Sequence, residues 1–171
     1  MLRIRRTVLL VALALIGLAM TSSAHADNIQ ITLTQTTLTG YAGTTITFDA
    51  TIANLTASTI FLNGDSSSTS SLSLVVNDNP FLTNAPLSLA AGASSGPFPF
   101  FNVNIAPGTS AGTYTGTFAI LGGATGTDFS TQGSVPFTVL VSPVPEPGTL
   151  TLLASGAVLV GIWKRRKSSH A

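Results

Sequence analysis

Apolar and polar residues alternate through the middle of this chain. Between residues 46 and 52, Ile, Phe, Ala and Ile are separated by Thr and Asp. This period of two places the apolar side chains on one face of a β-strand. The same signal predicts six more strands, near 29–33, 59–62, 72–76, 101–105, 114–120 and 135–141. No helical period is found between Asp27 and Ser142, so an all-β domain is expected.

Turn-rich segments such as 63–66 and 106–109 separate the predicted strands, and 66–71 is expected to be a polar loop. A long connection over 83–97 has room for one more short strand at Leu87 and Leu89. About seven strands joined in this way predict a single antiparallel, immunoglobulin-like β-sandwich over residues 27–142. The chain has no Cys, so packing and sheet hydrogen bonds must stabilise this domain.

Tyr114 offers a local test of this fold prediction. It follows a turn and lies near the start of the penultimate predicted strand. A tyrosine corner occupies this place in immunoglobulin-like domains, with the phenol bonded to a backbone group upstream. The alternative is a plain core tyrosine.

The N-terminal segment has the three parts of a secretory signal peptide. Arg3, Arg5 and Arg6 form a positive region, and residues 7–20 form an apolar run. Ala24-His25-Ala26 supplies the small-x-small cleavage site. We predict a signal helix within residues 1–26, with Ala24 and Ala26 read by signal peptidase and Asp27 as the first mature residue.

The C-terminal segment begins with a stiff tether over 143–148. Proline has a fixed φ and no backbone donor, and it favours extended geometry in the residue before it, so this tether cannot join a sheet. The uncharged stretch 149–163 predicts a short transmembrane helix. A basic tail over 164–171 follows and should stay in the cytoplasm. Its stop-transfer residues are Lys164, Arg165, Arg166 and Lys167.

The order of these three parts resembles the PEP-CTERM sorting signal of Gram-negative bacteria. The resemblance covers residues 144–167, and its motif is Val144-Pro145-Glu146-Pro147. It implies recognition of these four residues by an exosortase, transient anchoring in the inner membrane, and delivery to the cell surface or an exopolysaccharide matrix. An ordinary membrane anchor with a proline-rich stalk is the alternative.

Charge separates the two ends from the middle. All seven Lys and Arg residues lie in the two terminal segments. The charged side chains of residues 27–147 are all acidic. Neutralising nucleic-acid phosphates or anionic lipids requires Lys or Arg. We therefore expect no nucleic-acid partner for the exported portion.

Catalysis and metal binding have little support in the middle of the chain. Activating a nucleophile requires a base such as His or Lys, and residues 27–147 contain neither. Nothing in the sequence pairs Asp49, Asp65, Asp78 and Asp128 for acid–base work. The run Asn77-Asp78-Asn79-Pro80 resembles a cadherin calcium linker, but a turn is favoured. We expect no enzyme activity, no cofactor and no metal.

Three further features have both a functional and a structural interpretation. Phe98 and Phe100 can stack on a sugar or pack beneath the long connection. Asn54-Leu55-Thr56 is a glycosylation-type sequon, and a chance match is the alternative. The loop within 122–133 is a candidate binding loop. The predicted function is that of a surface or matrix-associated structural or adhesive protein, with exopolysaccharide as a candidate partner. The alternative is a carbohydrate- or calcium-binding extracellular module.

Overall fold

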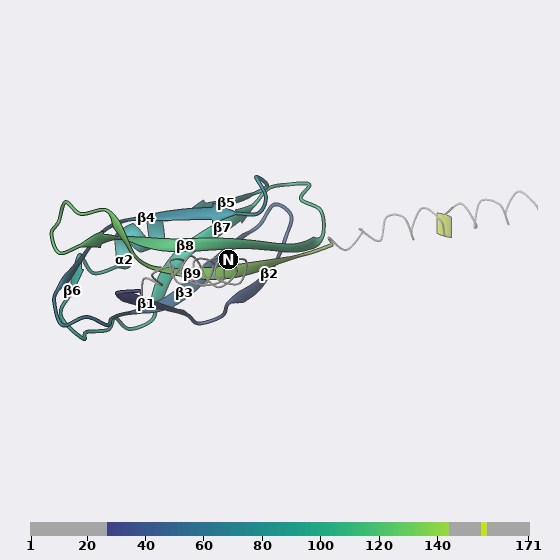
Figure 1. The fold of residues 1–171 in the computed structure, drawn as a ribbon. Coiled ribbons are helices and arrows are strands. Elements are labelled where there is room, and N and C mark those ends of the chain that lie inside the picture. Colours follow the sequence, from purple (N-terminus) through teal and green to yellow (C-terminus); the bar gives the residue numbers. More distant parts are fainter. Residues whose placement is uncertain (1–26, 144–154, 157–171) are drawn as a thin grey trace, which may run out of the picture.

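The computed structural model describes residues 27–143 and 155–156. Residues 27–143 form a β-sandwich of two sheets (Figure 1). The first sheet has the order β1-β3-β7-β5, and the second has the order β2-β9-β8-β4-β6. The strands of the first sheet are β1 (Ile29–Leu33), β3 (Thr45–Asn54), β7 (Phe98–Ile105) and β5 (Leu74–Asn77). Those of the second are β2 (Thr37–Tyr41), β9 (Ser130–Ser142), β8 (Gly112–Gly123), β4 (Ile60–Thr69) and β6 (Ser88–Leu89).

The strand order is that of an immunoglobulin-like sandwich. With the strands lettered in chain order, β1, β3, β7 and β5 take the places of A, B, E and D, and β9, β8 and β4 those of G, F and C. The first segment changes sheets, because β1 pairs antiparallel with β3 whereas β2 pairs parallel with β9. The all-β sandwich expected from the alternating pattern is therefore confirmed.

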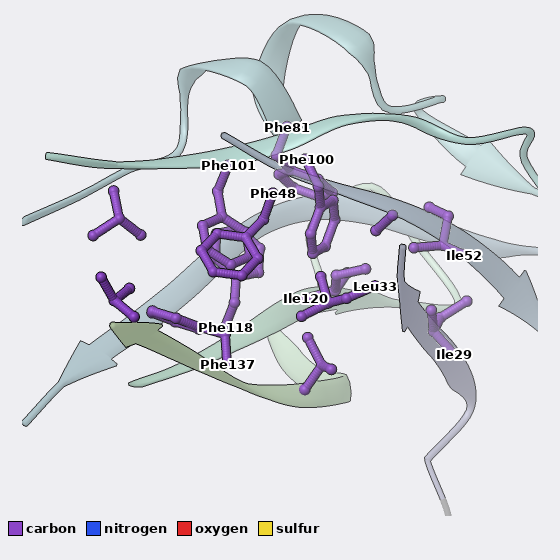
Figure 2. Packing of buried hydrophobic residues seen from close by; sticks show 14 of the residues in the cluster. Ile29, Leu33, Phe48, Ile52, Phe81, Phe100, Phe101, Phe118, Ile120 and Phe137 are labelled. Atoms are coloured by element: carbon purple, nitrogen blue, oxygen red, sulfur yellow. The ribbon is translucent and has the colours of Figure 1, made fainter. Parts of the chain in front are cut away.

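The core lies between the sheets and is built on phenylalanine. Phe101 is fully buried and stacks on Phe118, with ring centroids 4.8 Å apart and planes within 5° of each other. Phe48 and Phe137 each lie 4.9 Å from the Phe101 ring (Figure 2). Phe100 joins the same group at 5.7 Å. Burial of these rings stabilises the sandwich without any disulfide, since aromatic side chains bury the largest apolar areas.

The alternation predicted the inner face of most strands correctly. Phe48, Ala50 and Ile52 on β3 are buried, and alternate residues are buried in the same way over 101–105 of β7 and 133–141 of β9. Leu72 is an exception, because it is fully exposed and precedes β5, which begins at Leu74. Leu87 also lies outside its predicted strand and is exposed, whereas Leu89 is buried on β6.

Two segments predicted as turn and loop form one long strand instead. β4 continues through 63–69 and pairs with β8 as far as Thr69↔Gly116. A register shift between Leu62 and Gly64 accommodates the Asn-Gly pair, because a bulge places an extra residue in one strand without ending the ladder. Sequence analysis also missed β2. With β2 and the short β6, the described residues contain nine strands where about seven were expected.

One short helix interrupts the all-β pattern. Helix α2 (Asn79–Asn84) follows β5 directly, and Pro80 lies in its first turn, where a missing N–H costs nothing. Six residues are too few to display a helical period in the sequence, which is why the pattern did not reveal this helix. Its buried Phe81 packs edge-on against Phe100 and Phe118 and covers one end of the core.

β9 leads from the sandwich to the C-terminal segment. It is paired on both sides to its end, with Tyr41↔Ser142 on β2 and Gly112↔Val141 on β8. Figure 1 shows that β9 ends at the opposite end of the molecule from β6. Among the described residues, no helix is long and apolar enough to cross a membrane. The predicted signal helix and transmembrane helix lie outside the described residues, and the predicted domain boundaries remain predictions.

Tyr114 forms the expected tyrosine corner. Its phenol donates a hydrogen bond of 2.9 Å to the carbonyl oxygen of Ser110 in the turn before β8. Tyr114→Phe removes only this bond, so we expect a loss of about 1 kcal/mol in unfolding free energy. Urea denaturation measures the loss, and Tyr41→Phe serves as the control because its exposed phenol has no hydrogen bond among the described residues. Equal stability of both variants would show that the corner contributes nothing.

Candidate functional site

The residues assigned to export lie outside the described part of the chain. These are Ala24 and Ala26 of the signal cleavage site, Val144, Pro145, Glu146 and Pro147 of the sorting motif, and Lys164, Arg165, Arg166 and Lys167 of the stop-transfer cluster. Their individual roles remain predictions. The structure does show where the tether starts. Ser142 is the last residue of β9, and Pro143 follows it fully outside the sheet and exposed.

The structure brings together two carboxyl groups that the sequence left apart. Asp65 lies on β4 opposite Ile120 of β8 and therefore faces the inner side of its sheet. Asp78 occupies the N-cap position of α2, where its side chain makes no capping hydrogen bond. Burial, the charge of Asp78 and a side-chain hydrogen bond to Asp78 together raise the pKa of Asp65 from 3.8 to about 6. Sequence reasoning missed this pair because it placed Asp65 in a turn.

The raised pKa makes the stability of the fold depend on pH. The folded state holds the Asp65 proton more tightly than the unfolded chain, so the contribution to stability is complete below about pH 4 and is lost as the pH rises through about 6. Asp65→Asn should therefore stabilise the protein at pH 7. We expect a gain of about 1–2 kcal/mol, which is less than the full shift implies because solvent reaches part of the carboxyl.

Urea denaturation at pH 4 and pH 7 checks this expectation. The gain of Asp65→Asn over the unchanged protein should be larger at pH 7 than at pH 4. Asp49→Asn is the matched control, since Asp49 is an exposed residue of β3 outside the Asp65–Asp78 pair and should give no gain of this size at pH 7. If Asp65→Asn gave the same gain in unfolding free energy at pH 4 and pH 7, the raised pKa of Asp65 would be contradicted.

The calcium interpretation of Asn77-Asp78-Asn79-Pro80 gains no support. The backbone N–H of Asn79 donates to Oδ1 of Asn77 at 3.0 Å, which is the Asx-turn chemistry favoured from sequence. The segment then enters α2. Within residues 27–143, no three His, Cys, Asp or Glu side chains come together as a metal site would require.

The other acidic residues are dispersed. Asp49 lies beside a depression of about 130 Å³ that Thr34 and Gln35 also line. Asp128 holds its own loop, because its carboxylate accepts a 2.9 Å hydrogen bond from the N–H of Thr125. Asn63 donates to the backbone oxygens of both Thr125 and Asp128. The loop after β8 is therefore closed by internal hydrogen bonds.

Phe100 does not form the sugar-stacking surface considered from sequence. It is fully buried, and its ring lies 4.7 Å from that of Phe118. Phe98 is partly buried and meets Phe100 edge-on at 5.8 Å. The alternation of β7 breaks here, because a register shift against β3 leaves Phe100 between the pairs Phe48↔Phe101 and Asp49↔Pro99 and both Phe100 and Phe101 are buried. The packing interpretation is therefore correct for this pair.

Asn54 of the sequon is occupied by structural hydrogen bonds. It is buried, and its Nδ2 donates to the carbonyl oxygens of Ser58, Leu89 and Ala90 at 2.7–3.0 Å. Its Oδ1 accepts from the N–H and hydroxyl of Thr56. These bonds tie the turn after β3 to the end of β6. The side chain is thus not accessible to a glycosyl donor, in agreement with the view of the sequon as a chance match.

Together, the sandwich and the composition of the chain define a class of protein. A β-sandwich without a cationic side chain is followed at once by a proline-rich tether, an apolar stretch and a basic cluster, which is the layout of a cargo domain with a C-terminal sorting signal. Comparison with protein-family models matches residues 143–167 to the PEP-CTERM protein-sorting motif. The chain therefore carries a PEP-CTERM sorting motif, as its sequence predicted. The motif implies export, anchoring of the C-terminus in the membrane before processing, and processing by an exosortase.

Comparisons with whole proteins add only a distant likeness in fold. No curated protein matches the chain. Three similar solved structures are native alpha-2-macroglobulin from Escherichia coli, spanning domain MG7 to the C-terminus; WR4, an MSP family member from C. elegans; and a family 123 glycoside hydrolase from Clostridium perfringens.

The first of these has 21% identity and a TM-score of 0.45, and the match covers 69% of this chain and 17% of that chain. The second has 12% identity and a TM-score of 0.39, with 68% and 100% covered. The third has 8% identity and a TM-score of 0.39, with 70% and 28% covered. At these values, the likenesses carry no information about function.

Proposed function

We propose that this protein is a structural or adhesive component of the cell surface or exopolysaccharide matrix of a Gram-negative bacterium. The observation that carries the proposal is the PEP-CTERM match at 143–167, which begins one residue after β9 ends at Ser142. The sandwich is then the cargo, and we expect it to stay folded when the tail is cut because residues 27–143 build both sheets among themselves.

The composition of the sandwich supports a role outside the cell without catalysis. Residues 27–143 hold five Asp and no Lys, Arg, His or Cys. They therefore offer no cation to bind phosphate and no amine or imidazole to act as a base. The proposed role is accordingly non-enzymatic. A matrix or surface location suits a domain whose stability comes from an aromatic core and sheet hydrogen bonds.

Processing of the tail is the direct test of the sorting step. In a Gram-negative host that encodes an exosortase, the unchanged protein should begin at Asp27 and lack the 149–171 segment by intact mass. Glu146→Ala should retain that segment and remain in the membrane fraction, because the change removes the only charge of the proposed recognition motif.

Asp49→Ala is the matched control, since it also removes one carboxylate, but from an exposed position on β3. It should be processed like the unchanged protein. Normal trimming of Glu146→Ala would overturn recognition through this motif. A full-length chain, with residues 1–26 still attached in the cytosol, would overturn the export proposal as a whole.

A further inference from the structure

Uncharged hydroxyl groups are arranged in rows on the outer face of the second sheet. Thr115 of β8 lies opposite Thr138 of β9, which lies opposite Thr37 of β2. In the next row, Thr117 of β8 lies opposite Ser68 of β4. Neighbouring strands are about 4.8 Å apart, so these hydroxyls are regularly spaced across the sheet.

The outer face is hollowed where β4, β8 and β9 lie side by side. A depression of about 400 Å³ is lined by Ser68, Thr69, Ser70, Thr115, Gly116, Thr117 and Pro136. A second depression of about 270 Å³ shares Ser68 and Thr69 and extends to Leu72 and Val75 beside β5. Because the two share the end of β4, they form one trough, which we call the hydroxyl trough, around the open edge of the sandwich.

Several hydroxyls of the trough are available to a ligand. Ser68, Thr115 and Thr117 are exposed, and their hydroxyls make no hydrogen bond with any described residue. The neighbouring hydroxyls hold the walls in place. Thr69 donates to the backbone oxygens of Ser71 and Leu74, and Ser70 accepts from the N–H of Thr115 at 3.0 Å. The trough therefore combines a fixed frame with free donors and acceptors.

The charge of the trough restricts the class of ligand. None of its lining residues is charged, and Asp65 on the same strand faces the inner side of the sheet. A calcium ion requires several carboxylate or carbonyl oxygens, and phosphate, sulfate or carboxylate groups pair with Lys or Arg. The remaining match is a neutral polyol, which hydrogen bonds to hydroxyls and covers apolar surface such as Pro136, Leu72 and Val75.

We infer that the hydroxyl trough binds a neutral polysaccharide chain. The five Asp residues of the sandwich repel an acidic polymer, whereas an uncharged glycan meets an uncharged surface. No aromatic platform lines the trough, so binding by one site should be weak. Many copies on one surface would add their contacts through multivalency. This inference rests on the proposed extracellular function and names the partner class for it.

Affinity electrophoresis of the full chain tests the inference. The protein is purified in a polyoxyethylene detergent without a sugar head group and run in native gels that contain mixed-linkage β-glucan, dextran or alginate. We expect β-glucan or dextran to retard the unchanged protein and alginate to leave it unaffected. Thr115→Val combined with Thr117→Val removes two hydroxyls while keeping β-branched side chains, and should weaken retardation by about fivefold or more. Ser68→Ala should weaken it as well.

Thr39→Val combined with Thr113→Val is the matched control, because both residues face outward on the same sheet outside the trough. This control should run like the unchanged protein in every gel. The inference is overturned if neither neutral polymer retards the unchanged protein, if alginate retards it equally, or if the control loses as much retardation as the trough variants. These outcomes leave the sorting proposal standing, since tail processing is measured separately by mass.

Discussion

Phe101→Ala should unfold this protein more readily than any other single core truncation, with a loss of about 3–5 kcal/mol in unfolding free energy. Phe101 is fully buried and contacts the rings of Phe48, Phe100, Phe118 and Phe137 (Figure 2). Removing its ring leaves a cavity. The neighbouring rings cannot fill it by local collapse, because they are held on β3, β8 and β9 and on β7 itself. The change also removes the stacked and tilted ring contacts that add to area burial.

Urea denaturation followed by circular dichroism measures the loss, and Phe129→Ala is the matched control. Phe129 is 62% exposed in the loop before β9, so its truncation should change the unfolding free energy by about 0.5 kcal/mol or less. Domains of this size typically have 5–15 kcal/mol of stability. A loss of less than 1 kcal/mol for Phe101→Ala would show that the rings do not form the main core.

The aromatic core was largely predictable from the sequence, because most of its rings lie at alternating positions of predicted strands. Phe48, Phe101 and Phe137 all fall on predicted inner faces, and all are buried. Phe81 could not be found in this way, because it lies on a six-residue helix whose orientation depends on the sheet beneath it. Short elements borrow their stability from tertiary packing and leave little trace in the sequence.

The C-terminal end of β4, at the open edge of its sheet, was the least predictable part of the fold. Residues 66–69 of β4 are all Ser or Thr and show no alternation, yet backbone pairing with β8 holds them in a strand. Their side chains lie at an open edge, so neither face demands an apolar residue. Both the Asp65–Asp78 pair and the hydroxyl trough depend on this extension of β4. These two features could not be predicted, because the side chains at the end of β4 are not buried and therefore show no alternation in the sequence.

The sorting signal, unlike the end of β4, was predictable because it is written in consecutive residues. Its information lies in the order of local segments, namely a proline-bracketed acid, an apolar stretch and a basic cluster, and not in contacts between distant residues. The family match over 143–167 confirms that reading of the tail. The ligand of the exported domain has no comparable linear motif, because the trough brings together residues 68–70, 115–117 and 136 through strand pairing.

Gly133→Ala should be strongly destabilising, with a loss of about 3 kcal/mol in the free energy of unfolding. Gly133 is buried on β9, where β1 of the other sheet crosses directly over it. A Cβ at this position would overlap the carbonyl oxygen of Ile29 and lie 3.0 Å from its carbonyl carbon. The obstacle is backbone, and Ile29 is fully buried and paired with Asn54, so β1 cannot move aside without losing its own sheet contacts.

Gly96→Ala is the matched control for this close approach. A Cβ at Gly96 meets no heavy atom within 4 Å, so the same chemical change should be neutral or slightly stabilising through the unfolded chain. Thermal and urea denaturation of the two variants separate a steric effect from a general effect of adding a methyl group. If Gly133→Ala were as stable as Gly96→Ala, β1 would have to lie farther from β9 than it does here.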